Sequence, residues 1–296
     1  MTAIIDAHHH LWSLSDVRHA WLAERGVRRF FGDPTPIQRD YLVPDYRADC
    51  AGIALLGDVH VQVGVAPGAE IEETAFLAAQ RNVHGGPSAA VAFADLRADD
   101  LAATLESHAQ FDLVRGVRQI VGRRADEDAA RNESLLADPR FAAGLKRLAA
   151  HDLSFDLQAR FDQLEACAAL LAPVEGLRVA LCHLGSPWDR SPEGFARWRR
   201  GINAMARLPG AHAKISGLGM LIGRWRVEDA WPLVEAVIDA FGAERVMIGS
   251  NFPVDTLAQP ADETWRQLIA LCASLSEAER VAIQVETARR FYRLQS

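Results

Sequence analysis

Eight short runs rich in apolar and β-branched residues recur along the chain: Ile4–His10, Val59–Val65, Ala89–Leu96, Val114–Ile120, Ser154–Arg160, Arg178–Leu184, Ala211–Leu218 and Arg245–Phe252. Seven longer segments repeat apolar residues with the helical period: Ala98–Gln110, Pro139–His151, Phe161–Ala172, Pro192–Leu208, Val227–Phe241, Ala261–Ser274 and Ser276–Leu294. In the last segment, Ser276 is expected to cap the helix, with Glu279 completing a capping box. The pattern therefore predicts strands that alternate with helices.

Several of the strand runs are apolar on both faces, as in Arg178–Cys182. Continuous apolar runs are typical of strands buried in a parallel sheet. Strands that alternate with helices form parallel crossovers, and eight such units favour closure into a barrel. We predict an α/β fold, a (β/α)₈ TIM barrel, as a single domain over residues 1–296.

A long stretch without regular periodicity, Trp12–Tyr46, follows the first predicted strand. It contains several aromatic residues and prolines. Long irregular loops in barrels are often lids or binding loops. A packed surface excursion that covers the barrel mouth explains the pattern equally well, so both interpretations stay open.

Composition is that of an ordinary globular protein, with 49% hydrophobic and 24% charged residues and a formal net charge of -7. This acidic balance gives no reason to expect nucleic acid or an anionic membrane as a partner. We expect a small-molecule substrate, and a homo-oligomer is compatible with the sequence. The N-terminal residues show no signal peptide, and no apolar run is long enough to span a bilayer. The four cysteines form no C-x-x-C pair, so we expect a reduced, cytoplasmic setting.

The most specific local signal is Asp6-Ala7-His8-His9-His10 at the end of the first run. Residues two apart on a strand face the same way, so His8 and His10 are expected to project together and His9 oppositely. Two imidazoles at the C-terminal end of a barrel strand can bind a metal or polarise a carbonyl. Asp6, on the same face, is expected to orient an imidazole. A buried pair satisfied by backbone carbonyls is the alternative.

Polar residues also end the sixth and eighth runs. His183 interrupts the sixth run, where barrel enzymes place catalytic groups, and we expect it to join His8 and His10. Asn251 ends the eighth run, where its amide can donate and accept hydrogen bonds but cannot act as a general base. Asp255, four residues later, is a candidate base or an ordinary acid at a helix N-terminus. An imidazole of His8, His10 or His183 is the other candidate base and the favoured one, because strand geometry points these side chains into the pocket.

Three further runs end in residues that suit substrate binding. Arg118 ends the fourth run, and its guanidinium suits a carboxylate or a lactone oxygen, although a salt bridge within the mouth is an equal alternative. Gln158 ends the fifth run, and Lys214 ends the seventh. Each is interpreted as a substrate contact or as a routine polar group at a strand end.

Taken together, these motifs resemble the amidohydrolase superfamily, and within it the branch of lactonases that act on 2-pyrone-4,6-dicarboxylate and on sugar lactones. The motifs that carry the resemblance are Asp6-Ala7-His8-His9-His10-Leu11-Trp12, Gly116-Val117-Arg118-Gln119, Phe155-Asp156-Leu157-Gln158, Cys182-His183-Leu184-Gly185, Lys214-Ile215-Ser216-Gly217-Leu218, Phe241–Pro253, and Thr287-Ala288 with Phe291-Tyr292. The resemblance implies a (β/α)₈ barrel. It implies that His8, His10 and His183 bind metal or polarise the scissile carbonyl. It also implies that Arg118 contacts the substrate, and we take Trp12 as a further contact.

The chain departs from the family pattern at two positions. Gln158 stands where metal-dependent members have a histidine ligand, which argues against a binuclear metal centre. Asn251 stands where most relatives have the aspartate that activates water. We therefore expect no required cofactor, or one divalent ion such as zinc on His8, His10 and His183.

The function predicted from the sequence is hydrolysis of a small lactone that bears hydroxyl or carboxylate groups, by attack of water on the ring carbonyl. A metal-dependent decarboxylase or hydratase on the same barrel is one alternative. A non-catalytic small-molecule binding protein is the other, because the fold alone does not imply catalysis.

Overall fold

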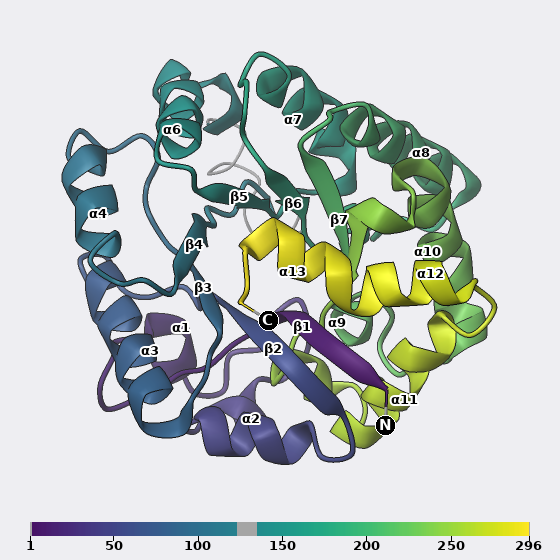
Figure 1. Cartoon of the computed structure of the whole chain (residues 1–296), viewed down its shortest axis with the longest axis horizontal. Coiled ribbons are helices and arrows are strands. Elements are labelled where there is room, and N and C mark those ends of the chain that lie inside the picture. Colours follow the sequence, from purple (N-terminus) through teal and green to yellow (C-terminus); the bar gives the residue numbers. More distant parts are fainter. Residues whose placement is uncertain (1, 123–134, 296) are drawn as a thin grey trace.

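The computed structural model describes residues 2–122 and 135–295. Within these residues, eight strands form one sheet in the order β1 to β8, and each strand is parallel to its neighbours. The strands are β1 (Ala3–His9), β2 (Ala54–Val61), β3 (Ala89–Ala92), β4 (Val114–Val117), β5 (Ser154–Leu157), β6 (Val179–Leu181), β7 (Ala211–Ile215) and β8 (Val246–Ile248). Helices surround the strands (Figure 1). The arrangement confirms the predicted (β/α)₈ barrel.

The first and last strands meet just beyond the end of β8. The backbone N–H of Asn251 donates to the carbonyl of His8 at 2.7 Å, and the N–H of His10 donates to the carbonyl of Phe252 at 2.8 Å. These two hydrogen bonds place Asn251 beside the histidines of β1.

The described helices are α1 (Ala20–Ala23), α2 (Val43–Asp49), α3 (Glu70–His84), α4 (Leu101–His108), α6 (Pro139–Ala150), α7 (Leu164–Leu171), α8 (Pro192–Ala206), α9 (Leu218–Ile222), α10 (Val227–Phe241), α11 (Ala261–Leu271), α12 (Glu277–Val281) and α13 (Thr287–Tyr292). Local sequence explains many of their boundaries. In α6, for example, the Asp138 side chain accepts from the N–H of Arg140, and Pro139 occupies the first turn.

The structure differs from the prediction after the first strand. Helix α3 was not predicted, because its buried face includes the polar residues Glu73 and Thr74 and so lacks a clean apolar stripe. Glu73 is buried because its carboxylate accepts from the N–H of Val63 at 2.8 Å. Strand β2 begins at Ala54 rather than at Val59.

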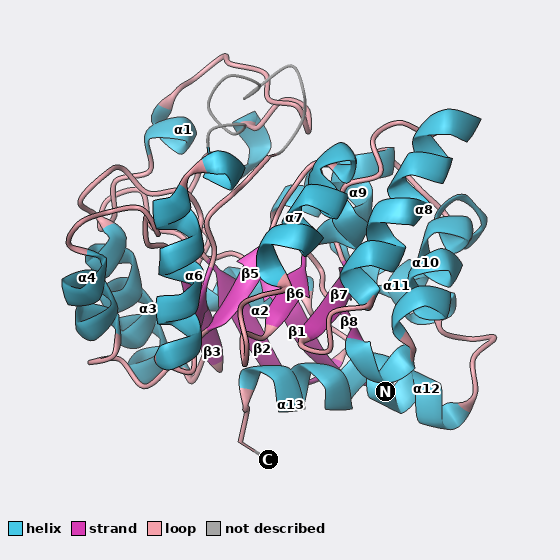
Figure 2. Cartoon of the chain, turned by 90° about the horizontal axis from the view of Figure 1, so that it is seen from above, coloured by secondary structure: helices cyan, strands magenta, loops and turns pink. Residues whose placement is uncertain are grey.

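The predicted C-terminal helix is divided into α12, a π-helical turn (Ala282–Glu286) and α13. The predicted capping box is confirmed, because Ser276 Oγ accepts from the N–H of Glu279 at 3.3 Å and Glu279 accepts from the N–H of Ser276 at 2.8 Å. Helix α13 lies across the end of the barrel away from α1 (Figure 2). Its Phe291 and Tyr292 pack in one apolar cluster with Ile5 of β1. This end of the barrel is therefore filled, and a ligand site is left to the other end.

The stretch that the sequence left irregular, Trp12–Tyr46, is a folded excursion with α1, a 3₁₀ turn (Thr35–Ile37) and the start of α2. Trp12 and Tyr41 pair across it by backbone hydrogen bonds of 2.9 Å in both directions. In the part of the chain that the structure describes, no helix has both the length and the apolar character needed to cross a membrane. The four cysteines are free and buried.

Candidate active site

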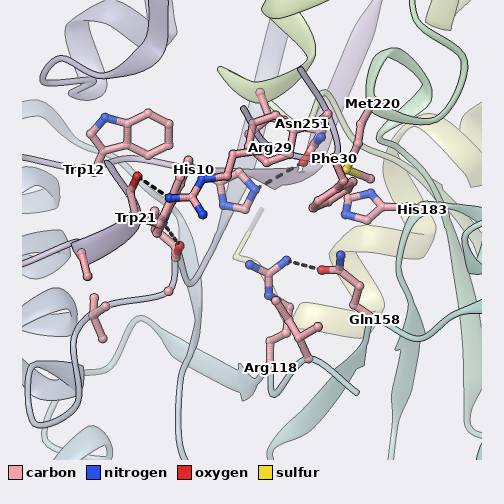
Figure 3. Close-up of a pocket in the computed structure, with 17 residues that line it drawn as sticks. His10, Trp12, Trp21, Arg29, Phe30, Arg118, Gln158, His183, Met220 and Asn251 are labelled. Carbon is pink, nitrogen blue, oxygen red and sulfur yellow. Dashed lines mark hydrogen bonds between the residues drawn. The ribbon is translucent and has the colours of Figure 1, made fainter. Parts of the chain in front are cut away.

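A cavity of about 300 Å³ opens at the C-terminal ends of the strands. Among its described lining residues, polar side chains come from five different strand ends: His10, Arg118, Gln158, His183 and Asn251. The loop after β1 contributes a second group: Trp12, Trp21, Arg29, Phe30 and Phe31. Figure 3 shows both groups facing the cavity. From the sequence, this aromatic loop could be either a lid or a packed cover of the barrel mouth. Arg29 was not predicted as a site residue.

The three consecutive histidines at the end of β1 point to two sides, His9 to one and His8 and His10 to the other. Its pairing with β2 shifts register between Asp6 and His9. His9 stacks on Tyr46 of α2, with ring centroids 4.0 Å apart, and its Nε2 lies 3.0 Å from the carboxylate of Asp58. The ring of His8 instead lies 5.1 Å from that of His10 and 4.6 Å from that of His183. The structure thus brings His8, His10 and His183 together.

The expected role of Asp6 is wrong. Its carboxylate accepts hydrogen bonds from Tyr46 Oη at 2.9 Å and from Ser250 Oγ at 2.6 Å, rather than from an imidazole. The register shift in β1 breaks the simple alternation on which the prediction relied. Asp6 instead joins β1 to α2 and to the segment after β8. Burial raises the pKa of this carboxyl group, against the opposing effects of His9 and Ser250.

The three clustered imidazoles are kept neutral by their surroundings. Burial lowers the pKa of His8, His10 and His183 well below the usual histidine value. Neighbouring positive charges lower it further, from Lys214 at His8 and from Arg118 at His10. Each ring therefore has one N–H donor and one lone pair.

The tautomer of His10 follows from its backbone partner. His10 Nδ1 lies 2.6 Å from the carbonyl oxygen of Val61, which only accepts hydrogen bonds. Nδ1 therefore carries the proton, and the lone pair is on Nε2. That atom lies 3.3 Å from Asn251 Oδ1.

The orientation of the Asn251 amide is set by Asp255. Asn251 Nδ2 donates to Asp255 Oδ1 at 2.8 Å, so the amide oxygen faces His10. Asp255 itself accepts from the N–H groups of Gly219 and Met220, at 2.9 and 3.2 Å, and is not among the lining residues of the cavity. Burial raises the pKa of Asp255 to about 6, although these three hydrogen bonds oppose the shift.

Arg118 and Gln158 lie side by side on neighbouring strand ends. Arg118 Nη1 donates to Gln158 Oε1 at 3.2 Å, and Nη2 donates to the carbonyl of Gln62. Both side chains are buried and line the cavity. The guanidinium thus places a fixed positive charge at the cavity wall, across from His10 and His183 (Figure 3).

The remaining predicted site residues lie at different depths. His183 lines the cavity, and its Nδ1 lies 2.9 Å from Ser216 Oγ. Trp12 also lines it, with its indole N–H donating to the carbonyl of Arg39 at 2.6 Å. Lys214 is fully buried and does not line the cavity, because its ammonium binds Asp156 at 2.6 Å inside the barrel.

The donor set does not suit a bound metal ion. Within the described part of the chain, no group of three or more His, Cys, Asp or Glu side chains is arranged to hold one. None of the described lining residues is an aspartate or a glutamate. The ammonium of Lys214, 3.5 Å from His8 Nδ1, and the nearby guanidinium of Arg118 add positive charge that would repel a cation.

Comparisons with known proteins show which family and fold this chain is similar to. The sequence pattern of the family described as amidohydrolase matches residues 5–294. An uncharacterized protein of Sinorhizobium fredii, y4mH, is 35% identical, with 99% of each chain covered. The L-fucono-1,5-lactonase of Burkholderia multivorans is 32% identical, with 98% of this chain and 96% of the relative covered. The crystal structure of an amidohydrolase from Burkholderia multivorans with bound zinc superposes with a TM-score of 0.83 at 29% identity, over 99% of this chain and 100% of that chain.

Proposed function

This chain belongs to the amidohydrolase family, and we propose that it opens a small lactone by attack of water on the ring carbonyl. The main support for this proposal is that two hydrogen-bond acceptors, His10 Nε2 and Asn251 Oδ1, face each other at the cavity wall. Two lone pairs at 3.3 Å repel each other unless a donor lies between or beside them. A water molecule is the smallest group that donates to both.

In this proposal, a water molecule donates one hydrogen to Asn251 Oδ1 and the other to His10 Nε2. Its remaining lone pairs are then free to attack the carbonyl carbon. As the new C–O bond forms, the proton passes to His10 Nε2, which is neutral and has its lone pair available. His10 thus acts as the base that Asn251 cannot be.

The charge that develops on the carbonyl oxygen requires a stabilising partner. The Arg118 guanidinium supplies a fixed positive charge in a buried wall, where it interacts more strongly than in water. When the tetrahedral intermediate collapses, the ring C–O bond breaks and the leaving alkoxide takes the proton from His10. The products are a hydroxy acid and the original enzyme, and no step requires a metal.

The cavity lining also favours a class of substrate. Its described charged side chains are both arginines, Arg29 and Arg118, and aromatic residues of the loop after β1 also line it. Donor-rich walls suit a ligand rich in acceptors, such as a lactone that carries a carboxylate, and the aromatic rings suit a flat or deoxygenated ring face. We therefore rank carboxylated lactones above neutral sugar lactones.

The experiment is a turnover panel with chelator-treated protein, read by the acid released on ring opening. The panel contains L-fucono-1,5-lactone, other aldonolactones, 2-pyrone-4,6-dicarboxylate and, for decarboxylation, a hydroxybenzoate. We expect saturable lactone hydrolysis that the variant His10→Asn loses. Hydroxybenzoate decarboxylation without lactone opening, or binding without any turnover, would refute the proposal.

A further inference from the structure

A buried charge cluster lies in the barrel interior beneath the cavity and takes no part in the chemistry proposed above. Lys214 of β7 and Asp156 of β5 form an ion pair at 2.6 Å, and both side chains are fully buried. Tyr292 of α13 donates to the same carboxylate at 2.8 Å. Buried ion pairs are costly to desolvate and contribute little net stability. Stability alone therefore does not explain this cluster, and its effect on the neighbouring side chains has to be considered.

The three N–H bonds of the Lys214 ammonium have three acceptors. They are Asp156 Oδ2 at 2.6 Å, the carbonyl oxygen of Ala7 at 2.7 Å and His8 Nδ1 at 3.5 Å. An ammonium group has no lone pair, so it can only donate. His8 Nδ1 must therefore present its lone pair to Lys214, and the proton of this neutral ring is on Nε2.

His8 Nε2 is a buried donor without a partner among the described residues. Leaving such a group unsatisfied costs about 1–3 kcal/mol. The His8 ring contacts the rings of His10 and His183, both of which line the cavity. His8 itself is fully buried and is not among the described lining residues, so a ligand oxygen would satisfy its Nε2 only by entering between these rings.

We propose that Lys214 is a positioning residue that fixes His8 as the Nε2–H tautomer, so that His8 donates a hydrogen bond to the carbonyl oxygen of the bound lactone. His8 and His10 are then neighbouring imidazoles with opposite tautomers, one a donor and the other an acceptor. A protonated Nε2 has no lone pair, so in this tautomer His8 would not coordinate a metal ion through Nε2. The assignment of the tautomer stands on geometry alone, whereas the carbonyl partner rests on the proposed function.

The first test reads the tautomers directly. Long-range ¹H–¹⁵N correlation spectra of ¹⁵N-labelled protein distinguish protonated from unprotonated ring nitrogens, and His8→Asn and His10→Asn assign the signals. At pH 8 we expect a protonated Nε2 for His8 and a protonated Nδ1 for His10. A protonated Nδ1 on His8 would overturn the proposal, whether or not any lactone is hydrolysed.

The second test removes the lysine without leaving a buried charge. In the double variant Lys214→Met/Asp156→Asn, we expect His8 to lose its single tautomer and kcat on the best lactone to fall about 10²-fold with little change in KM, as for the loss of one oxyanion donor. The matched control Tyr292→Phe removes another hydrogen bond of the same cluster and keeps the His8 tautomer. A double variant that folds and retains the Nε2–H signal would show that Lys214 does not fix it.

Discussion

The amide oxygen of Asn251 lies 3.3 Å from Nε2 of His10, so that two hydrogen-bond acceptors face each other in the wall of the cavity. Neither group is free to turn away. Val61 fixes the His10 proton on Nδ1, and Asp255 holds the nitrogen of the amide. The pair therefore forms a site for a donor, and water is the donor that the proposed reaction requires.

Replacing His10 removes the proposed base. We expect His10→Asn to lower kcat by about 10²–10⁴-fold, the usual contribution of a general base, with an unchanged fold by circular dichroism. The matched variant His9→Asn alters a neighbouring histidine that stacks on Tyr46 and faces away from the cavity. It is expected to reduce thermal stability more than kcat. Equal losses of kcat in the two variants would contradict the assignment.

Introducing an aspartate at position 251 is not expected to increase kcat. In Asn251→Asp, the new carboxylate lies beside that of Asp255, where the amide now donates at 2.8 Å. Two buried carboxylates at this distance share one proton, so the variant should be less stable and less active at pH 8. The exchange Asn251→Asp/Asp255→Asn separates the charges and should recover part of the activity. A strong gain in Asn251→Asp alone would mean that lactone hydrolysis is not the natural reaction.

The pH dependence of kcat/KM should report on Asp255. Its pKa is raised to about 6, whereas that of His10 lies well below the usual histidine value. Once Asp255 is protonated it can donate to the Asn251 amide oxygen, and the amide then turns its nitrogen toward His10 and blocks the water site. We expect kcat/KM to fall as the pH decreases through about 6. In Asp255→Asn this acid limb should disappear, and a limb that persists there would assign it to another group.

The same carboxyl group predicts a change in stability with pH. A folded-state pKa above the unfolded value favours the folded state at low pH, and this contribution is lost as the pH rises through the folded pKa. Relative to Asp255→Asn, the free energy of unfolding of the wild type should therefore decrease by about 2 kcal/mol between pH 4 and pH 8, which is most of the effect of a shift of about two pKa units. Urea denaturation at a series of pH values measures this difference. An increase over the same range would contradict the raised pKa.

Arg118 and Arg29 should differ in their kinetic roles. Arg118 is buried beside Gln158, and Arg118→Lys should lower kcat about 10²-fold, because an ammonium does not reproduce the guanidinium geometry. Arg29 lies in the loop and pairs with Glu24 at the surface, so Arg29→Lys should mainly raise KM for a carboxylated lactone. Steady-state kinetics on the two variants separates these effects, and a pure KM effect at Arg118 would remove it from oxyanion stabilisation.

Metal content is expected to be low. The cluster has three neutral imidazoles, two nearby cationic groups and no carboxylate among the described lining residues. We predict at most one weakly bound divalent ion, and activity that survives chelation. Elemental analysis of protein purified without chelators that finds two equivalents of zinc per chain would refute this.

The barrel and the gathering of strand-end residues were predictable because apolar runs and the polar residues that end them are local signals. His10, Arg118, Gln158, His183 and Asn251 all follow buried strands, and parallel strands carry such residues to one rim. Strand geometry favoured an imidazole over Asp255 as the base, but which of His8, His10 and His183 takes this role was not predictable. It depends on which groups hold His10 and Asn251. Val61, the partner of His10, is distant in sequence, and Asp255 reaches Asn251 only through the particular turn that joins them.

Two differences between the predicted and the observed positions of side chains have local physical causes. Asp6 faces Tyr46 and Ser250 because the register of β1 shifts, which no alternation of residue types reveals. Lys214 points into the barrel, where an apolar residue is the usual occupant, because Asp156 and Tyr292 supply its partners. Helix α3 escaped prediction for a related reason, since Glu73 satisfies a backbone group within the core.

The loop after β1 places two tryptophans at the cavity, where their fluorescence can report on ligand binding. Trp12 and Trp21 both line it, with ring centroids 6.1 Å apart, and their indole N–H groups are fixed by backbone carbonyls. A lactone without an aromatic ring is invisible in the near ultraviolet. We expect its binding beside these two indoles to change the tryptophan fluorescence, so that binding can be followed even in a variant without turnover.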